Sequence, residues 1–440
     1  MQSLFDEEHF CPRTKDSYNK ECQYLEEATN DILKKKLSTL YGINKRSPLT
    51  KLPDFDVTIQ LPQDVMHTVL EGVLQYEIRL VLDYFIRNNF FTLVQLNAAI
   101  INHDYGYSEV GDKPGALKET VFNGNESYKL KYNAAQARLF LRLVPFYILN
   151  HVDAEDEHFL FLMELSSIVN LLYAPIIKTE SIQVLRQLIC EHLHKFTTLF
   201  EDVNIIPKQH YLIHLPTMIT QLGPLIRSSC FAFESAHNYF KQLAPKQNFK
   251  NLIMSLASRH QFLECANFGD GSGNPAAHPL FSTEKKLGVL KRTTNAELGN
   301  LRSNFDKFSL LPNTSLENVC RVSWIILHGT KYCNKGVIAV TVTMEPALPV
   351  FGYIKEIWIM HDYVYFEVSI LETICMESSY QAYNVKYTDV EEVFICPYER
   401  LVDFNVYHIK KVEQELYIPI KYDVDDIVEE YAIGNLLLNN

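Results

Sequence analysis

The feature that most constrains the fold of this chain is a single change of pattern near residue 316. Before it, long apolar segments carry the three-to-four residue spacing of helices. After it, short segments rich in β-branched and aromatic residues recur with turn signals between them, as in an antiparallel β domain. The clearest predicted helices are 92–102, 131–150, 157–173 and 180–201.

The pattern predicts an α+β fold in four parts. Residues 1–51 form an N-terminal helical segment, and 52–264 form a core with a helical insertion at about 90–205. The Gly- and Pro-rich composition of 265–315 predicts a linker, and 316–435 predict a small antiparallel β-barrel or sandwich. Inside the core, the Pro-bounded stretch LPDFDVTIQLP predicts a short strand, followed by a helix from Asp64 to about residue 87.

Composition excludes several classes of protein. The chain has 440 residues, of which 47% are hydrophobic, so it can bury a core. Its formal charge of −12 opposes DNA binding by the whole surface. Nine cysteines without a CxxC pair argue against a disulfide framework or a Cys-based zinc site. Neither a signal peptide nor a membrane-length apolar run is present, so we expect an intracellular protein, nuclear or cytoplasmic and not secreted.

The stretch LPQDVMHTVLEG holds the first candidate site residues. On a helix, the spacing of Asp64, His67 and Glu71 places all three on one face. The same spacing recurs in FESAHNYFK, where it relates Glu234, His237 and Lys241. Carboxylates on separate segments are what a two-metal phosphoryl-transfer site requires, and oxygen ligands suit Mg²⁺ or Mn²⁺.

Plain structural roles compete with this interpretation. Asp64 suits a helix N-cap, and Glu234 suits the first turn of a helix. Glu71 fits a solvated helix position. His210 and His214, four residues apart in HYLIH, suit core or interface positions. A carboxylate-bridged di-iron bundle would need two further acids, such as Glu164 and Glu191.

A local excess of positive charge surrounds the second motif. Residues 205–262 hold six basic residues and a single acid, Glu234. Such a strip fits a nucleic-acid backbone, and it equally fits a solvated helix face. The basic residues are Lys208, Arg227, Lys241, Lys246, Lys250 and Arg259.

Three blocks, DVMHTVLEG, KQHYLIHLP and GPLIRSSCFAFESAHNYFK, resemble in that order the CACTA-type (En/Spm) transposases and the animal proteins derived from them. The resemblance implies a DDE transposase with an RNase H-like fold and divalent metal. It implies that Asp64 is the second catalytic Asp, His67 the histidine that follows it, and Glu234 the final Glu. His210 and His214 would belong to the middle block, and the helices between Asp64 and Glu234 to the family's insertion.

The family's first Asp has no counterpart that we identify among residues 1–63, so the RNase H-like core is expected to be incomplete. The leading hypothesis is a remnant or fragment of a transposase that would cut and join DNA with metal, inactive as this chain alone. A second is a domesticated, non-catalytic DNA- or chromatin-associated protein, whose β domain binds a partner near Trp358, Tyr363 and Tyr365. A third is an unrelated metallohydrolase that uses a set of six residues, Asp64, His67, His210, His214, Glu234 and His237.

Overall fold

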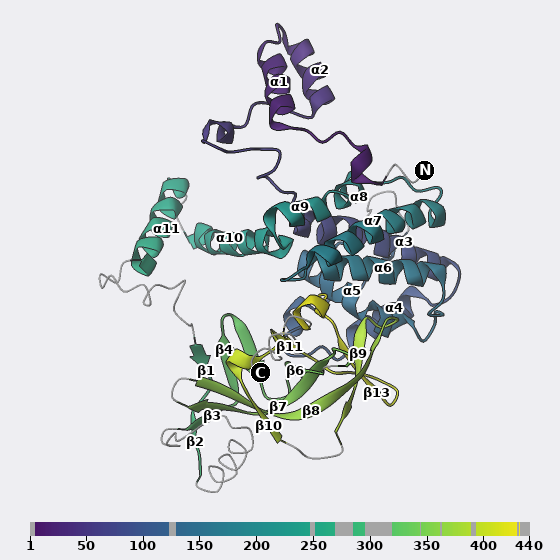
Figure 1. Cartoon of the computed structure of the whole chain (residues 1–440), viewed down its shortest axis with the longest axis vertical. Helices are drawn as coiled ribbons and strands as arrows, with labels where there is room; N and C mark the ends of the chain where they lie inside the picture. The colour runs from purple at the N-terminus through teal and green to yellow at the C-terminus, as the bar shows by residue number, and fades with distance from the viewer. Residues whose placement is uncertain are drawn as a thin grey trace.

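A helical body and a curled antiparallel sheet form the two halves of the computed structural model (Figure 1). A helical hairpin from the N-terminal segment and an arm of two helices extend away from the body. The structure describes residues 5–122, 129–246, 251–268, 285–294, 319–343, 345–360, 363–388, 393–428 and 431. The predicted α+β class is therefore confirmed.

The helices match the predicted segments closely. Their ends carry the expected signals: Thr92 and Asn133 cap α4 and α5 through capping boxes. The helices are α1 (Lys15–Glu26), α2 (Asp31–Tyr41), the π-helix η4 (Met66–Val73), α3 (Leu74–Arg87), α4 (Leu93–Asn102), α5 (Ala134–Ile148), α6 (Glu157–Leu172), α7 (Thr179–Leu199), α8 (Pro207–Leu212), α9 (Leu215–Leu222), α10 (Phe231–Leu243) and α11 (Leu252–Phe268).

The predicted strand at 52–62 is wrong. These residues form turns, in which the Asp56 side chain accepts hydrogen bonds from the backbone and hydroxyl of Thr58. Such an Asx-type turn competes with extended structure. Every regular element in the described part of 52–264 is a helix, so an RNase H-like core is not confirmed there.

The C-terminal half is an open, curled sheet rather than a closed barrel. Its strands run in the order β11-β6-β7-β8-β9-β13-β12, while β10 pairs with β8, β3 with β7 and β2 with β3; β1, β4 and β5 form a separate small sheet. Bulges interrupt the long β7–β8 hairpin and the β8–β9 pairing, and such bulges bend a sheet. The strands are β1 (Lys285–Leu287), β2 (Lys291–Arg292), β3 (Cys320–Val322), β4 (Trp324–Leu327), β5 (Thr330–Cys333), β6 (Val337–Val342), β7 (Pro349–Met360), β8 (Tyr363–Glu377), β9 (Ala382–Tyr387), β10 (Val393–Pro397), β11 (Asp403–Tyr407), β12 (Lys410–Val412) and β13 (Glu415–Pro419).

The linker expected at 265–315 is in part structured. α11 continues to Phe268, and β1 and β2 pair with β4 and β3. Strands of two and three residues are too short to show a sequence pattern, because they are defined only by their pairing with neighbouring strands. Residues 269–284 and 295–318 lie outside the described residues.

The two halves share one hydrophobic core. Side chains of the sheet, such as Phe351, Tyr383 and Ile418, pack in the same cluster as the helices of the body. A second cluster, which includes Ile338, Ile357 and Phe366, covers the other face of the sheet, since its residues alternate along the strands with those of the first cluster. The sheet is thus docked on the helices through buried apolar surface, which is the main favourable contribution to such packing.

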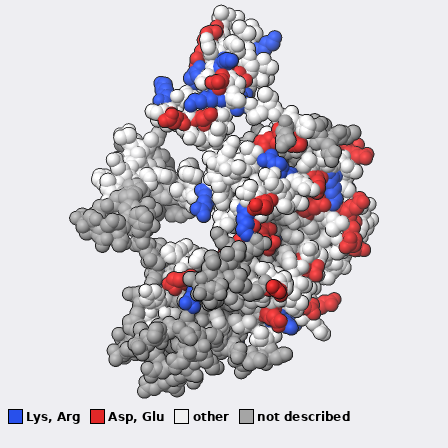
Figure 2. Space-filling model, viewed as in Figure 1, with Lys and Arg blue, Asp and Glu red and all other residues white. Residues whose placement is uncertain are grey.

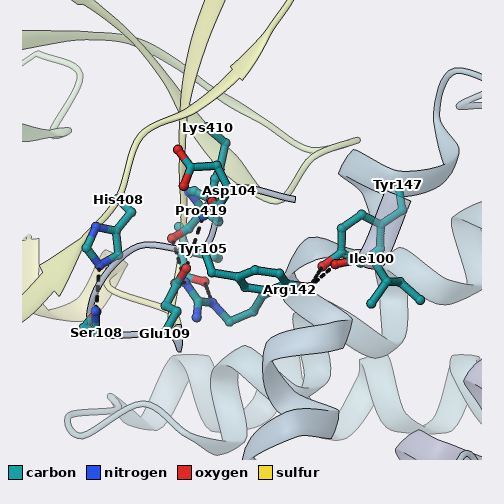
Figure 3. Close-up of polar contacts among 11 residues, drawn as sticks. Ile100, Asp104, Tyr105, Ser108, Glu109, Arg142, Tyr147, His408, Lys410 and Pro419 are labelled. Atoms are coloured by element: carbon teal, nitrogen blue, oxygen red, sulfur yellow. Dashed lines mark hydrogen bonds and ion pairs between the residues drawn. The ribbon is translucent and has the colours of Figure 1, made fainter. Parts of the chain in front are cut away.

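A buried polar network crosses the boundary between the halves (Figure 3). Glu109 accepts hydrogen bonds from Arg142 of α5 and Lys410 of β12, each at 3.2 Å. Burial alone raises the pKa of Glu109, but the two cations outweigh it and lower that pKa to about 2. Beside this group, the His408 ring accepts a hydrogen bond from the Ser108 hydroxyl at 2.8 Å. We call these five residues the seam network.

The close packing of Gly106 against the His408 ring gives a first testable prediction. A Cβ atom at Gly106 would lie 1.9 Å from Cγ of His408, in a space where the ring cannot move freely. We expect Gly106→Ala to lower the free energy of unfolding by about 1–3 kcal/mol, as overpacking does. Gly111→Ala is the matched control, since no atom lies within 4 Å of its Cβ position. Equal urea midpoints for the two variants would contradict the fit described here.

Acid should weaken the seam in a defined pH range. Burial lowers the pKa of His103 and of His408 from 6.5 to about 4, so both are neutral in the folded chain. The unfolded chain binds these protons first, so their contribution is complete above pH 6.5 and is lost as pH falls toward 4.

We expect roughly 1.4 kcal/mol of lost stability per pH unit for each histidine in that window. His408→Gln should reduce the slope measured by urea denaturation.

Candidate metal-binding site

Asp64 holds together the start of two helices. Its Oδ2 accepts the backbone N–H of His67 at 2.8 Å, which caps the helix that begins with η4. Its Oδ1 accepts the backbone N–H of Cys230, directly before α10, at 2.8 Å. Burial raises the pKa of Asp64, but these hydrogen bonds outweigh it and leave that pKa below its usual value. The N-cap role weighed from the sequence is confirmed.

His67 bridges the two carboxylates singled out in the sequence. Its Nδ1 lies 2.6 Å from Oδ2 of Asp64, and its Nε2 lies 3.3 Å from Oε1 of Glu234. The two ring nitrogens thus face one carboxylate each. The fold therefore places an imidazole ring where Asp64 and Glu234 meet.

Cys230 is a neighbour that the sequence analysis missed. Potential ligand atoms of Asp64, His67 and Cys230 lie within 4.8 Å of one another. Burial and the nearby Asp64 raise the pKa of the Cys230 thiol, so the free thiol is protonated. The sequence did contain a signal for Cys230, because this residue lies one helical turn before Glu234.

These donors fit a single divalent cation better than a pair. Mg²⁺ and Mn²⁺ prefer oxygen ligands, whereas imidazole nitrogen and thiolate sulfur suit Zn²⁺, so a set that mixes these donors does not by itself select Mg²⁺ or Mn²⁺. Within the described residues, the group of mutually close ligand atoms holds one carboxylate, that of Asp64, and Glu234 lies beside it through His67. The Glu234 side chain is 56% exposed, so an ion can reach it from solvent.

Other predicted site residues lie elsewhere. His237 is exposed on α10, and Glu71 does not join the group, since η4 is a π-helix whose wider turn breaks the predicted common face. The acids considered for a di-iron bundle are engaged elsewhere: Glu164 pairs with Lys195, and Glu191 accepts a hydrogen bond from Gln187.

His210 and His214 form a separate interface group. Their Nε2 atoms lie 3.4 Å apart, and Nδ1 of His214 lies 2.9 Å from Glu7. The ring of Phe10 packs edge-on against both. These side chains line a cavity of about 980 Å³ between the N-terminal segment and the body. The interface role weighed from the sequence is confirmed, and the six-residue metallohydrolase set is not assembled among the described residues.

The basic residues do not form one strip. Lys208 donates to the carbonyl oxygen of His67 at 2.5 Å, and its side chain lies over Gly72, so it stabilises η4 instead of facing solvent. Arg227, Lys241 and Arg259 are exposed on three different elements, η7 (Leu225–Ser228), α10 and α11. On the face shown in Figure 2, Lys and Arg occur in separate groups among acids. Lys246 lies in the short helix η8 (Ala244–Lys246), and Lys250 lies outside the described residues.

Comparison with known proteins does not identify this chain. No family model, curated protein or solved structure matches this chain. The resemblance to CACTA-type transposases therefore stays a prediction from the motifs. In the described part of the chain, no helix has the length and apolar character needed to cross a membrane.

The capping role of Asp64 can be measured. We expect Asp64→Ala to lower the free energy of unfolding by about 1–2 kcal/mol, because the N–H groups of His67 and Cys230 lose their acceptor. Asp64→Asn keeps an acceptor oxygen and should cost less. Urea denaturation of the two variants decides this, and equal losses would show that the cap is not what Asp64 contributes.

Proposed function

We propose that this chain derives from a CACTA-type DDE transposase and keeps a site for one divalent cation, formed by Asp64, His67 and Glu234. The observation that carries the proposal is the bridge through His67, which joins the two acids assigned by resemblance to the catalytic set. These acids lie on segments separated by all the helices from α3 to α9. Chain connectivity alone does not bring them together.

In this proposal, Asp64 and Glu234 bind the cation and His67 orients them. Mn²⁺ or Mg²⁺ would supply positive charge between the two carboxylates. The bound ion would act as a Lewis acid toward a phosphate oxygen. Strand cleavage of the DDE type uses two ions and a third carboxylate, so we propose that this chain binds metal without cutting DNA by itself.

The second candidate function is a non-catalytic, DNA- or chromatin-associated protein. Two observations favour it over an active transposase. Asp64 already accepts hydrogen bonds from both helix starts, and Lys208 is engaged with the carbonyl of His67. Groups used in this way stabilise the scaffold, which a domesticated protein would retain after catalysis is lost.

Calorimetric titration with MnCl₂ tests the cation site. We expect one ion to bind the wild-type chain, and Glu234→Gln to weaken its affinity at least tenfold through the loss of a charged ligand. Glu71→Gln is the matched control, because it removes the same charge from η4 without touching the site. Unchanged Mn²⁺ affinity in Glu234→Gln would refute the assignment.

A plasmid-nicking assay with Mn²⁺ separates the two candidate functions. The proposal expects no Mn²⁺-dependent nicking by the wild-type chain, although Mn²⁺ binds. Nicking that disappears in Glu234→Gln would restore the active transposase. DNA retention that is weakened by salt and indifferent to Mn²⁺ would favour the non-catalytic binding protein.

A further inference from the structure

A cavity of about 550 Å³ lies where the helical body meets the sheet. The helix α5 contributes Arg138 and Arg142 to its wall, and the segment after β13 contributes Lys421 and Tyr422. Phe231, the first residue of α10, closes another side. The cavity is thus lined by three cations that come from two distant parts of the chain.

Two of these cations, Arg138 and Lys421, form no ion pair with a carboxylate among the described residues, although Glu109 and Asp403 lie near enough to raise the pKa of Lys421. Both oxygens of Glu109 are taken, one by Arg142 and the other by Lys410. Arg138 instead donates to the backbone carbonyl of Lys421 at 2.7 Å and stacks over the Tyr173 ring at 4.3 Å. Within the described residues, no carboxylate forms an ion pair with Arg138 or Lys421, and Asp112 lies exposed in the wall.

Burial of these two charges favours the entry of an anion. It lowers the pKa of Lys421 to about 8 and that of Arg138 to about 10, because a buried charge loses hydration. Arg138 uses one amino group for the carbonyl of Lys421, which leaves other guanidinium donors for a ligand. The Lys421 ammonium lies 5.7 Å from the centre of the Tyr407 ring, and both Lys421 and Arg138 border the same cavity.

We propose that this cavity binds a phosphate-class oxyanion, held by Arg138 and Lys421. An arginine fork with a neighbouring lysine is a combination that suits a tetrahedral oxyanion with several acceptor oxygens. The volume exceeds that of an inorganic phosphate, which leaves room for an esterified group beside Phe231 and Tyr422. The inference goes beyond the cation site and does not depend on it.

Titration of the full chain with inorganic phosphate tests the site, by calorimetry and by thermal unfolding at constant ionic strength set with chloride. We expect saturable binding that stabilises the wild-type chain, and at least tenfold weaker binding in Lys421→Met. Lys421→Arg keeps the charge and should retain binding, which separates loss of the site from loss of the fold. The control is Lys355→Met, a change at an exposed lysine of β7.

Failure of phosphate to bind the wild-type chain would overturn the proposal, as would equal affinity in Lys421→Met and Lys355→Met. A short thymidine oligonucleotide, with or without a 5′-phosphate, then identifies the source of the anion. Lys421-dependent binding of the phosphorylated form alone indicates a phosphomonoester. Equal Lys421-dependent binding of both forms indicates the phosphodiester backbone.

Discussion

The pairing of Glu109 is the constraint on which the arrangement of the two halves depends. Its carboxylate is buried, and its two cationic partners come from opposite sides, Arg142 from the helices and Lys410 from the sheet. A buried charge that loses a partner is strongly destabilising, so the sheet can dock only where both cations reach Glu109. Arg142 also donates to the backbone carbonyl of Ile420, which ties the end of β13 to α5. The shared apolar core contributes most of the favourable free energy of docking. The polar network around Glu109 fixes the position of the sheet on the helices.

The same docking creates the cavity proposed to bind an oxyanion. It brings Arg138 and Lys421, neither of which forms an ion pair among the described residues, to one cavity. It also sets that cavity beside the cation site, because Phe231 lines the former and the adjacent Cys230 binds Asp64 through its backbone. The start of α10 is therefore common to both. The arm formed by α10 and α11 extends from the body at this point (Figure 1).

Prediction from the sequence succeeded for helices and strands with strong internal periodicity. It failed where contacts with residues distant in the chain decide the local structure. The long helices and the β-rich half follow from patterns within each segment. The stretch at 52–62 has the composition of a strand, but Asp56 turns the chain and no partner strand pairs with it in the described residues. Lys208 shows the same limit for function: a count of local charge cannot reveal that Gly72 makes space for its side chain over η4.

The sequence by itself determined the helix boundaries and the cap at Asp64, because their hydrogen bonds join residues only a few positions apart. It also indicated that Asp64, His67 and Glu234 belong together, through the resemblance of short motifs. Only the tertiary structure decided that Cys230 joins them, that Lys208 donates to the carbonyl oxygen of His67, and that Arg138 and Lys421 share a cavity. Each of these contacts joins residues far apart in the chain, so its existence depends on how the helices and the sheet pack.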